Sequence, residues 1–322
     1  MNPDAGPWIP PDQVRGKLLK PGMTGKDSFM DPTPTQPIRW PLEAIWEAVN
    51  GFTPALEGFT AEVLPSIDST NSELMRRFKG APGIAPRPEP TLLVAETQAA
   101  GRGRLGRNWY SQRGDSLTFS IGLALEPLDW SGLSLVVGIS IAESLDDRLD
   151  EGVESGQQIA LKWPNDLWVG KPGCERKLGG ILVETATLDG KRYVVIGVGI
   201  NIGVSINFGG ATPSTAGIPP GCLQDFFPDL DAPAALLRIV PRLVQNIQAF
   251  AQFGFAPYQA RFARRDVLAG RTVLLSDGLV GTAHGVGENG ALLVHTSAGM
   301  KEITSSEVSV RPVQANGGPR PC

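Results

Sequence analysis

Two apolar runs within residues 177–201 constrain the fold more than any other part of the sequence. They flank Asp189-Gly190, a dipeptide that is favoured in tight hairpin turns because its backbone is suited to positive φ. The sequence therefore predicts a β-hairpin in the middle of the chain, and this is the clearest hairpin signal that the chain contains.

From about residue 61 onward, short apolar runs alternate with helical patterns, which is typical of a compact α/β or α+β domain. A helix is expected to begin at Ser69 or Thr70, because either side chain can cap the amides ahead of Glu73. The other predicted helices cover 133–149 and 232–254, the latter with a break or kink at Pro241, and the other predicted strands cover 91–96, 116–125 and two parts of 158–169.

The two ends of the chain differ from this central part. The first 60 residues are rich in proline, and only residues 42–52 have the spacing of a short helix. Near the other end, short β runs alternate with glycine-containing turns, which predicts a small β-barrel. We expect an N-terminal extension (1–60), a main domain (61–268), a small C-terminal β-domain (269–313) and a disordered tail (314–322).

The overall composition excludes several classes of protein. Of the 322 residues, 41% are hydrophobic and 19% charged, and the formal net charge is −4, so there is no bulk attraction to nucleic acid or to an anionic membrane. The first residues lack a basic stretch followed by an apolar one, and no run of about 18 apolar residues occurs. The three cysteines lack the CxxC spacing of a zinc site. We therefore expect a cytoplasmic protein without membrane segments, in which any cationic function is local.

One local cationic segment is GRGRLGRNWY, residues 101–110. Glycines let a backbone approach a ligand closely, and arginines donate forked hydrogen bonds to phosphate or carboxylate oxygens. The segment therefore suits a polyanionic small ligand, but a solvated basic loop or an RNA-binding segment remain alternatives. Trp109 at its end either holds the loop in place or packs in the core. A Walker-type phosphate loop is excluded, because GxxxxGK[ST] is absent.

Two further segments favour a ligand site. KWPND places Lys162, Asn165 and Asp166 at a forced break between two strands. Lys177 precedes Gly179-Gly180, which lack side chains where a ligand could lie against the strand backbone. Each lysine taken alone is also compatible with a solvated strand end.

These segments, read in chain order, resemble a known family. The sequence contains DSTN (68–71), ETQAAGRGRLGRNW (96–109), KWPND (162–166), KLGGILVE (177–184) and GVGIN (197–201). Over about residues 62–312 the chain resembles the biotin protein ligases, also called biotin-[acetyl-CoA-carboxylase] ligases. The resemblance implies an α+β catalytic domain with a mixed β-sheet, of the type shared with lipoate ligases and class II aminoacyl-tRNA synthetases, followed by a small SH3-like barrel.

The resemblance also implies roles for individual residues. Lys177 corresponds to the family's lysine between the biotin carboxylate and the α-phosphate, and with Arg102 and Arg104 of the closing loop it is the expected catalytic group. Asp166 is the candidate metal ligand. The residues expected to bind biotin or nucleotide are Ser69, Thr70, Asn71, Gln98, Gly101, Arg102, Gly103, Arg104, Asn165, Asp166, Lys177, Gly180, Gly199 and Asn201.

The implied reaction uses biotin, ATP and Mg²⁺ to form biotinyl-5′-adenylate, and it then transfers biotin to a lysine of the biotin carboxyl carrier protein of acetyl-CoA carboxylase. Because the biotin carboxylate and ATP repel each other, fixed cations rather than an enzyme nucleophile are needed. The only two histidines, His284 and His295, lie in the C-terminal β-domain. A loop that closes over the adenylate would also exclude water from it.

The N-terminal extension departs from the family members that repress genes. It lacks a helix-turn-helix pattern and a dense basic face, so we expect a ligase without DNA-binding activity. A homodimer formed by edge-strand pairing is consistent with the resemblance. The two rival interpretations are a nucleic-acid binder that uses the Gly/Arg loop and a lipoate ligase, which shares the fold and the adenylation chemistry.

Overall fold

The computed structural model describes residues 37–52, 56–148, 158–203, 220–304 and 310–312. Residues 38–322 belong to one compact unit, separate from a unit formed by 1–37. The expected tail and most of the expected N-terminal extension therefore lie outside the described residues. Among the helices of the described residues, none has the length and apolarity needed to cross a membrane.

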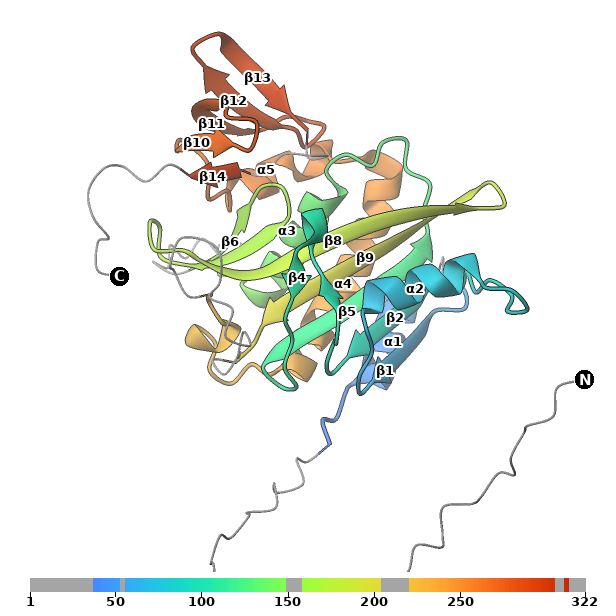
Figure 1. The fold of residues 1–322 in the computed structure, drawn as a ribbon. Coiled ribbons are helices and arrows are strands. Elements are labelled where there is room, and N and C mark those ends of the chain that lie inside the picture. The colour runs from blue at the N-terminus through green and yellow to red at the C-terminus, as the bar shows by residue number, and fades with distance from the viewer. Residues whose placement is uncertain (1–36, 53–55, 149–157, 204–219, 305–309, 313–322) are drawn as a thin grey trace, which may run out of the picture. The chain divides into compact units, whose positions relative to one another are not determined.

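A seven-stranded mixed sheet forms the centre of this unit (Figure 1). Its first two strands are parallel and all later neighbours are antiparallel, so the predicted α+β class with a mixed sheet is confirmed. The strands, in their order across the sheet, are β1 (Thr60–Leu64), β2 (Thr91–Ala95), β5 (Ser116–Ala124), β9 (Lys191–Asn201), β8 (Arg176–Leu188), β7 (Asp166–Gly170) and β6 (Gln158–Lys162).

The predicted hairpin lies at the centre of this sheet. Strands β8 and β9 pair without interruption from Gly179 opposite Ile200 to Leu188 opposite Lys191. Asp189 and Gly190 both have positive φ, at 51° and 78°, which is the backbone shape that the dipeptide predicts. Local turn chemistry therefore sets the register of the two longest strands.

Three helices cover one face of the sheet: α1 (Leu42–Phe52), α3 (Leu133–Leu145) and α4 (Ala232–Phe253). The predicted short helix over 42–52 is α1, and its buried residues Ile45 and Val49 belong to the main core. Helix α3 is buried on nearly all sides, which agrees with its apolar sequence. Of the expected break or kink at Pro241, the break is wrong, because α4 continues through that residue. Burial of its apolar side against α1 and α3 offsets the backbone hydrogen bond that proline removes.

The opposite face carries helix α2 (Thr70–Lys79), which begins as predicted with Ser69 as its N-cap. Leu74 and Phe78 pack against Leu93 and Val195 in a small second core. This helix covers parts of β2, β5, β8 and β9 on this face. The glycine-containing parts of β8 and β9 lie beyond it, and the site described below is built there.

A five-stranded antiparallel sheet forms the predicted C-terminal β-domain. Its strands are β10 (Thr272–Leu275), β11 (Val280–Val286), β12 (Leu292–Thr296), β13 (Gly299–Ile303) and β14 (Val310–Pro312). Two short helices, η3 (Ala256–Tyr258) and α5 (Gln259–Ala263), precede it. The domain contacts the main one through Trp163 Nε1, which donates to the carbonyl of Gly290 at 3.0 Å, and through an ion pair between Arg271 and Glu175.

The segment between the two domains runs along the edge strand β6. The amide of Leu161 donates to the carbonyl of Arg265, and the amide of Val267 donates to the carbonyl of Leu161. Between these bonds lies Asp266, whose Oδ1 accepts from the amide of Leu268. Among the described residues, its Oδ2 is buried without a hydrogen-bond partner, and burial raises the pKa of Asp266 to about 6.

The raised pKa of Asp266 predicts a pH-dependent cost of folding. The folded state binds the proton more tightly than the unfolded state does, so stability is lost as pH rises from about 4 to about 6. Wild type should lose about 2 kcal/mol of its free energy of unfolding between pH 4.5 and pH 7.5 through this group, and Asp266→Asn should not. The free energy of unfolding of Asp266→Asn minus that of wild type should therefore rise by about 2 kcal/mol over this range. Urea unfolding at both pH values measures it.

Asp277→Asn provides the matched control. Asp277 also accepts from a backbone amide two residues ahead, but it is exposed. A pH-independent difference between Asp266→Asn and wild type would show that Asp266 is not perturbed.

Candidate active site

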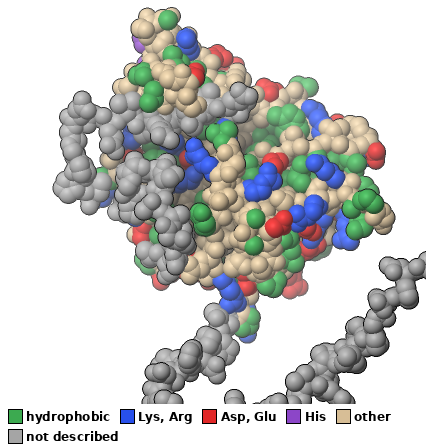
Figure 2. Space-filling view, viewed as in Figure 1, with side chains coloured by type: hydrophobic (Ala, Val, Ile, Leu, Met, Phe, Trp, Pro, Cys, Tyr) green, Lys and Arg blue, Asp and Glu red, His purple; other side chains and the backbone are tan. Residues whose placement is uncertain are grey.

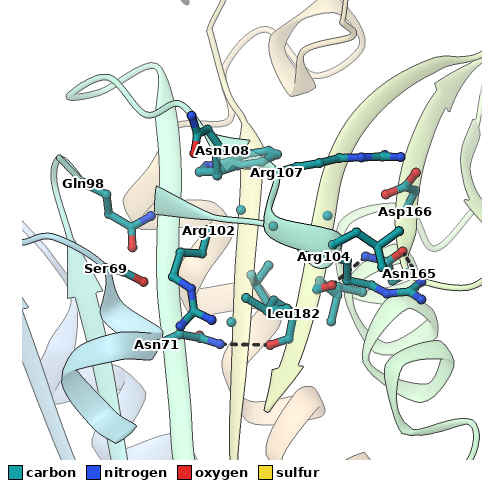
Figure 3. A pocket seen from close by; sticks show the side chains of 18 of the residues that line it. Ser69, Asn71, Gln98, Arg102, Arg104, Arg107, Asn108, Asn165, Asp166 and Leu182 are labelled. Atoms are coloured by element: carbon teal, nitrogen blue, oxygen red, sulfur yellow. Dashed lines mark hydrogen bonds between the residues drawn. The ribbon is translucent and has the colours of Figure 1, made fainter. Parts of the chain in front are cut away.

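A pocket lies on the open part of the sheet, between the start of α2 and the turn that joins β6 to β7 (Figure 3). Its floor is strand backbone: Gly180 of β8 pairs with Gly199 of β9, and Leu182 pairs with Gly197. A Cβ at Gly197 would collide with the Asn71 side chain, and one at Gly199 would collide with the Trp109 ring. Glycine is therefore required where other side chains cross the strands.

One end of the pocket is lined by uncharged polar side chains, and Arg102 also lies at this end. The amide of Thr70, at the N-terminus of α2, donates to Gln98 Oε1 at 2.8 Å. The buried Ser120 hydroxyl lies 2.6 Å from both Thr70 Oγ1 and Asn71 Oδ1. Asn71 Nδ2 donates to the carbonyl of Leu182 at 3.2 Å and to Glu184. Both hydrogens of the Asn71 amide are thus used within the protein, so Asn71 orders the wall of the pocket.

The Gly/Arg loop crosses above the glycine floor. It consists of the short strands β3 (Gly101–Arg102) and β4 (Asn108–Trp109), joined by a 3-10 turn, η1 (Arg104–Gly106). The loop meets the sheet at three places: Trp109 lies on Gly199, Arg102 pairs with Glu184, and Arg104 Nη1 donates to Asn165 Oδ1 at 3.2 Å. Figure 3 shows Arg102 directed toward Asn71 and Arg104 directed toward Asn165.

The other end of the pocket is cationic and centres on Asp166. Lys177 Nζ donates to Asp166 Oδ1 at 2.7 Å, and Lys162 Nζ lies 3.8 Å from Oδ2. Burial alone would raise the pKa of Asp166, but the two lysines outweigh it, so the pKa lies below its ordinary value. Burial also lowers the pKa of Arg104. Asp166 is therefore an ionised partner that holds both lysines in the pocket.

Most of the residues predicted for the site come together here. Gly101 and Asn201 do not line the pocket: Gly101 is the first residue of the loop, beside the Trp109 carbonyl and Gln98, and Asn201 Nδ2 donates to the carbonyls of Gly221 and Lys177. The predicted residues that do line it are Ser69, Thr70, Asn71, Gln98, Arg102, Gly103, Arg104, Asn165, Asp166, Lys177, Gly180 and Gly199.

The pocket contains further residues that the predicted set omits, chiefly Lys162, Arg107, Trp109 and Gly197. The alternation of Gly197 and Gly199 on one strand could have indicated a shared face, since residues two apart in a strand point the same way. No local sequence pattern indicates the hydrogen bond from Asn71 to Glu184, because the two residues are 113 positions apart.

The charges of the pocket determine what it can bind. Its described lining holds the five cations Arg102, Arg104, Arg107, Lys162 and Lys177, and Asp166 as its single carboxylate. Among the described residues, no group of three or more His, Cys, Asp or Glu side chains could hold a metal ion alone. The arrangement suits an anionic ligand that has an uncharged polar end.

Two family models match the chain. Residues 63–201 match the Biotin/lipoate A/B protein ligase family, and residues 270–311 match the Biotin protein ligase C terminal domain. The two matched segments correspond to most of the main domain and to the C-terminal β-domain.

Curated and solved proteins agree with these models. The chain is 34% identical over 271 residues to the Bifunctional ligase/repressor BirA of Escherichia coli, covering 80% of this chain and 76% of BirA. It is 28% identical over 251 residues to the Biotin--[acetyl-CoA-carboxylase] ligase of Paracoccus denitrificans, covering 76% and 98%. The structure is similar to that of the biotin protein ligase from Aquifex aeolicus in complex with biotin and ATP, with a TM-score of 0.61, 31% identity and coverage of 79% and 99%.

The close contact of Asn71 with the pocket floor can be tested by Gly197→Ala. Since Asn71 is held by Ser120, Leu182 and Glu184, it cannot move aside at low cost. We expect the substitution to lower the free energy of unfolding by about 1–3 kcal/mol, measured by urea unfolding.

A second glycine substitution provides the control. Gly51 lies near the end of α1, and no atom lies within 4 Å of the position that a Cβ would take there. Gly51→Ala should therefore be neutral or stabilising by up to about 1 kcal/mol. Wild-type stability of Gly197→Ala would show that the predicted collision does not occur.

Proposed function

The chain belongs to the biotin protein ligases, and we propose on this premise that it activates biotin with ATP and then transfers biotin to a lysine of the biotin carboxyl carrier protein of acetyl-CoA carboxylase. The observation that carries the proposal is a single pocket with an uncharged polar end at Thr70 and Gln98 and a cationic end at Lys177, under one glycine-rich loop.

The two ends of the pocket suit the two ends of biotin. The ureido ring of biotin is neutral and has donors and an acceptor, which match Ser69, Thr70 and Gln98. Its apolar ring would lie against the Trp109 ring, which covers Gly199 as the Asn71 side chain covers Gly197. The carboxylate at the end of its chain would then reach the cationic end of the pocket.

Fixed cations address the main barrier to the first step. A biotin carboxylate oxygen attacks the α-phosphorus of ATP and pyrophosphate leaves, so two anions must meet. Lys177 and Arg104 would lie against the carboxylate and the phosphate and stabilise the charge on the transferring group. Lys177 exchanges its Asp166 partner for the ligand in this scheme.

In the second step the neutral amine of the acceptor lysine attacks the acyl carbon of the adenylate, and AMP leaves. An amide bond replaces the mixed anhydride, and the amine loses a proton. No enzyme nucleophile takes part. The loop over the pocket excludes water, which would otherwise compete with the lysine for the adenylate.

Asp166 and Asn165 are the residues that would hold Mg²⁺. One carboxylate and one amide oxygen are few ligands, but Mg²⁺ is commonly bound by one or two carboxylates together with phosphate oxygens of the substrate. When bound, the ion neutralises charge on the phosphates of ATP. The protein contributes the position of Asp166, which Lys177 and Lys162 keep ionised in the ligand-free protein.

The decisive experiment is biotin-dependent exchange of pyrophosphate into ATP, repeated with lipoate in place of biotin. Exchange is expected with biotin, and avidin blotting should then show a biotinylated carrier domain. Exchange with lipoate but not with biotin would show that the protein is a lipoate ligase instead.

The role of Lys177 leads to a sharper prediction. Lys177→Ala should fold normally but should lose at least about a hundredfold in the exchange rate, the scale for removing one well-placed partner of the transition state. Lys191→Ala, which removes an exposed lysine at the hairpin turn, is the control and should keep the wild-type rate. A near-normal rate in Lys177→Ala would refute the assigned role.

We also propose that this ligase does not bind DNA. It is supported by the proline-rich sequence before residue 60 and by the charge pattern, since Arg76 and Arg77 on α2 pair with Asp68 and Glu73. On the face shown in Figure 2, basic side chains lie among acidic ones.

Fluorescence anisotropy with fragments of the source genome tests this proposal. Binding should be no tighter than about 1 μM at physiological salt, which is the range of non-specific complexes. A complex with a dissociation constant of about 10 nM, as specific DNA-binding proteins form, would overturn it.

A further inference from the structure

We propose that Glu184 is a positioning residue that holds the Gly/Arg loop closed through Arg102. Arg102 Nη2 lies 2.8 Å and Nη1 lies 3.3 Å from the two carboxylate oxygens of Glu184. Because each of the two nitrogens meets a different oxygen, the pair has the forked geometry that gives arginine–carboxylate contacts their directionality. We call this pair the loop latch. Its effect on the adenylate rests on the proposed function.

The place of Glu184 in the sheet makes it suited to this task. Gly180, Leu182 and Glu184 alternate along β8 and therefore share one face, which is the pocket face. The first two line the pocket, whereas Glu184 lies just outside it. The carboxylate thus stands at the rim of the pocket, where it can contact the loop without contacting a ligand.

Glu184 also connects the latch to the pocket wall. Its Oε2 accepts from Asn71 Nδ2 at 2.9 Å, and Asn71 Oδ1 lies 2.6 Å from the Ser120 hydroxyl. One carboxylate therefore orders Asn71 on the wall and Arg102 on the loop. Closure of the loop and order in the wall are coupled through it, because both partners donate to Oε2 and loss of either one leaves the carboxylate less constrained.

The latch assigns different tasks to the two arginines of the loop. The guanidinium group of Arg102 is neutralised by Glu184 and its side chain is 48% exposed, which places it at the surface. Arg104 is more buried and donates to Asn165, beside Asp166 and Lys177. Arg104 is therefore the loop arginine that faces the reacting anions, and Arg102 positions the loop.

Trypsin digestion of the ligand-free protein tests the latch without any adenylation. Glu184→Gln keeps an oxygen that can accept from Asn71 but removes the charge that holds Arg102, and it leaves every arginine of the loop in place for cleavage. We expect cleavage within residues 102–107 to become about two- to fivefold faster, the scale of one partly exposed ion pair. Glu62→Gln, which removes one of the two carboxylates paired with Arg77 on another part of the sheet, should leave cleavage unchanged. Equal cleavage in Glu184→Gln and wild type would overturn the latch.

Retention of the adenylate provides the second test. In protein loaded with biotin and ATP but without acceptor, Glu184→Gln should release biotinyl-adenylate about two- to fivefold faster than wild type. Its rate of adenylate formation at saturating biotin and ATP should fall less than twofold, since Glu184 does not contact the reacting atoms. A purely structural role would instead change both rates together and shift the unfolding midpoint.

The double variant separates the latch from a direct contact of Arg102 with the ligand. If the two side chains act as a pair, Arg102→Gln and Glu184→Gln should accelerate release equally, and the double variant should be no faster than either single variant. Effects that multiply would refute the pairing. Wild-type protein that forms no adenylate would refute the proposed function, whereas the trypsin result would still decide the latch.

Discussion

A strip of sheet backbone without side chains is the constraint on which the rest of the site depends. Gly180 and Gly199 face each other across β8 and β9, and Gly197 lies two residues from Gly199 on the same face. Trp109 and Asn71 occupy the space that side chains would otherwise fill. A ligand in the pocket therefore meets Trp109 and Asn71 at Gly199 and Gly197, and its other interactions must come from the loop, from α2 and from the β6–β7 turn.

A sheet face that is partly open to a pocket buries less apolar surface than a fully covered one. The opposite face of this sheet compensates, because it is covered by helices. Helices α1, α3 and α4 bury that face, with α3 apolar almost throughout. Burial of this kind contributes about 25 cal/mol per Å² of apolar surface, so one well-covered face can support an incompletely covered one. The same burial keeps α4 continuous through Pro241. The pocket thus lies on the face that α1, α3 and α4 do not cover, and burial of the helical face makes that placement stable.

Local chemistry predicted much of this architecture. The Asp189-Gly190 turn and the Ser69 cap are signals within a few residues, and the structure confirms the hairpin and the helix that they predict. The pairs that define the electrostatics depend instead on strand register. Lys177 reaches Asp166 because β7 and β8 shift register between Leu167 and Trp168, a bulge that no local pattern marks. The Arg102–Glu184 pair spans 82 residues and follows only from the folded sheet. Motif resemblance named Arg102 and Lys177, but it did not reveal their carboxylate partners.

The turn between β6 and β7 shows why the C-terminal domain belongs to the architecture of the site. On the side of the main sheet, Asn165 Nδ2 donates to the carbonyl of Ile181 in β8, and the amide of Ile181 donates to the carbonyl of Asn165. On the side of the C-terminal domain, Nε1 of the buried Trp163 donates to the carbonyl of Gly290 in the β11–β12 turn. Between these contacts the turn has little freedom, which is what Asp166 needs in order to hold two lysines at fixed distances. Since an indole N–H buried without a partner is costly, removing the β11–β12 turn would weaken the support of the cationic end from a distance.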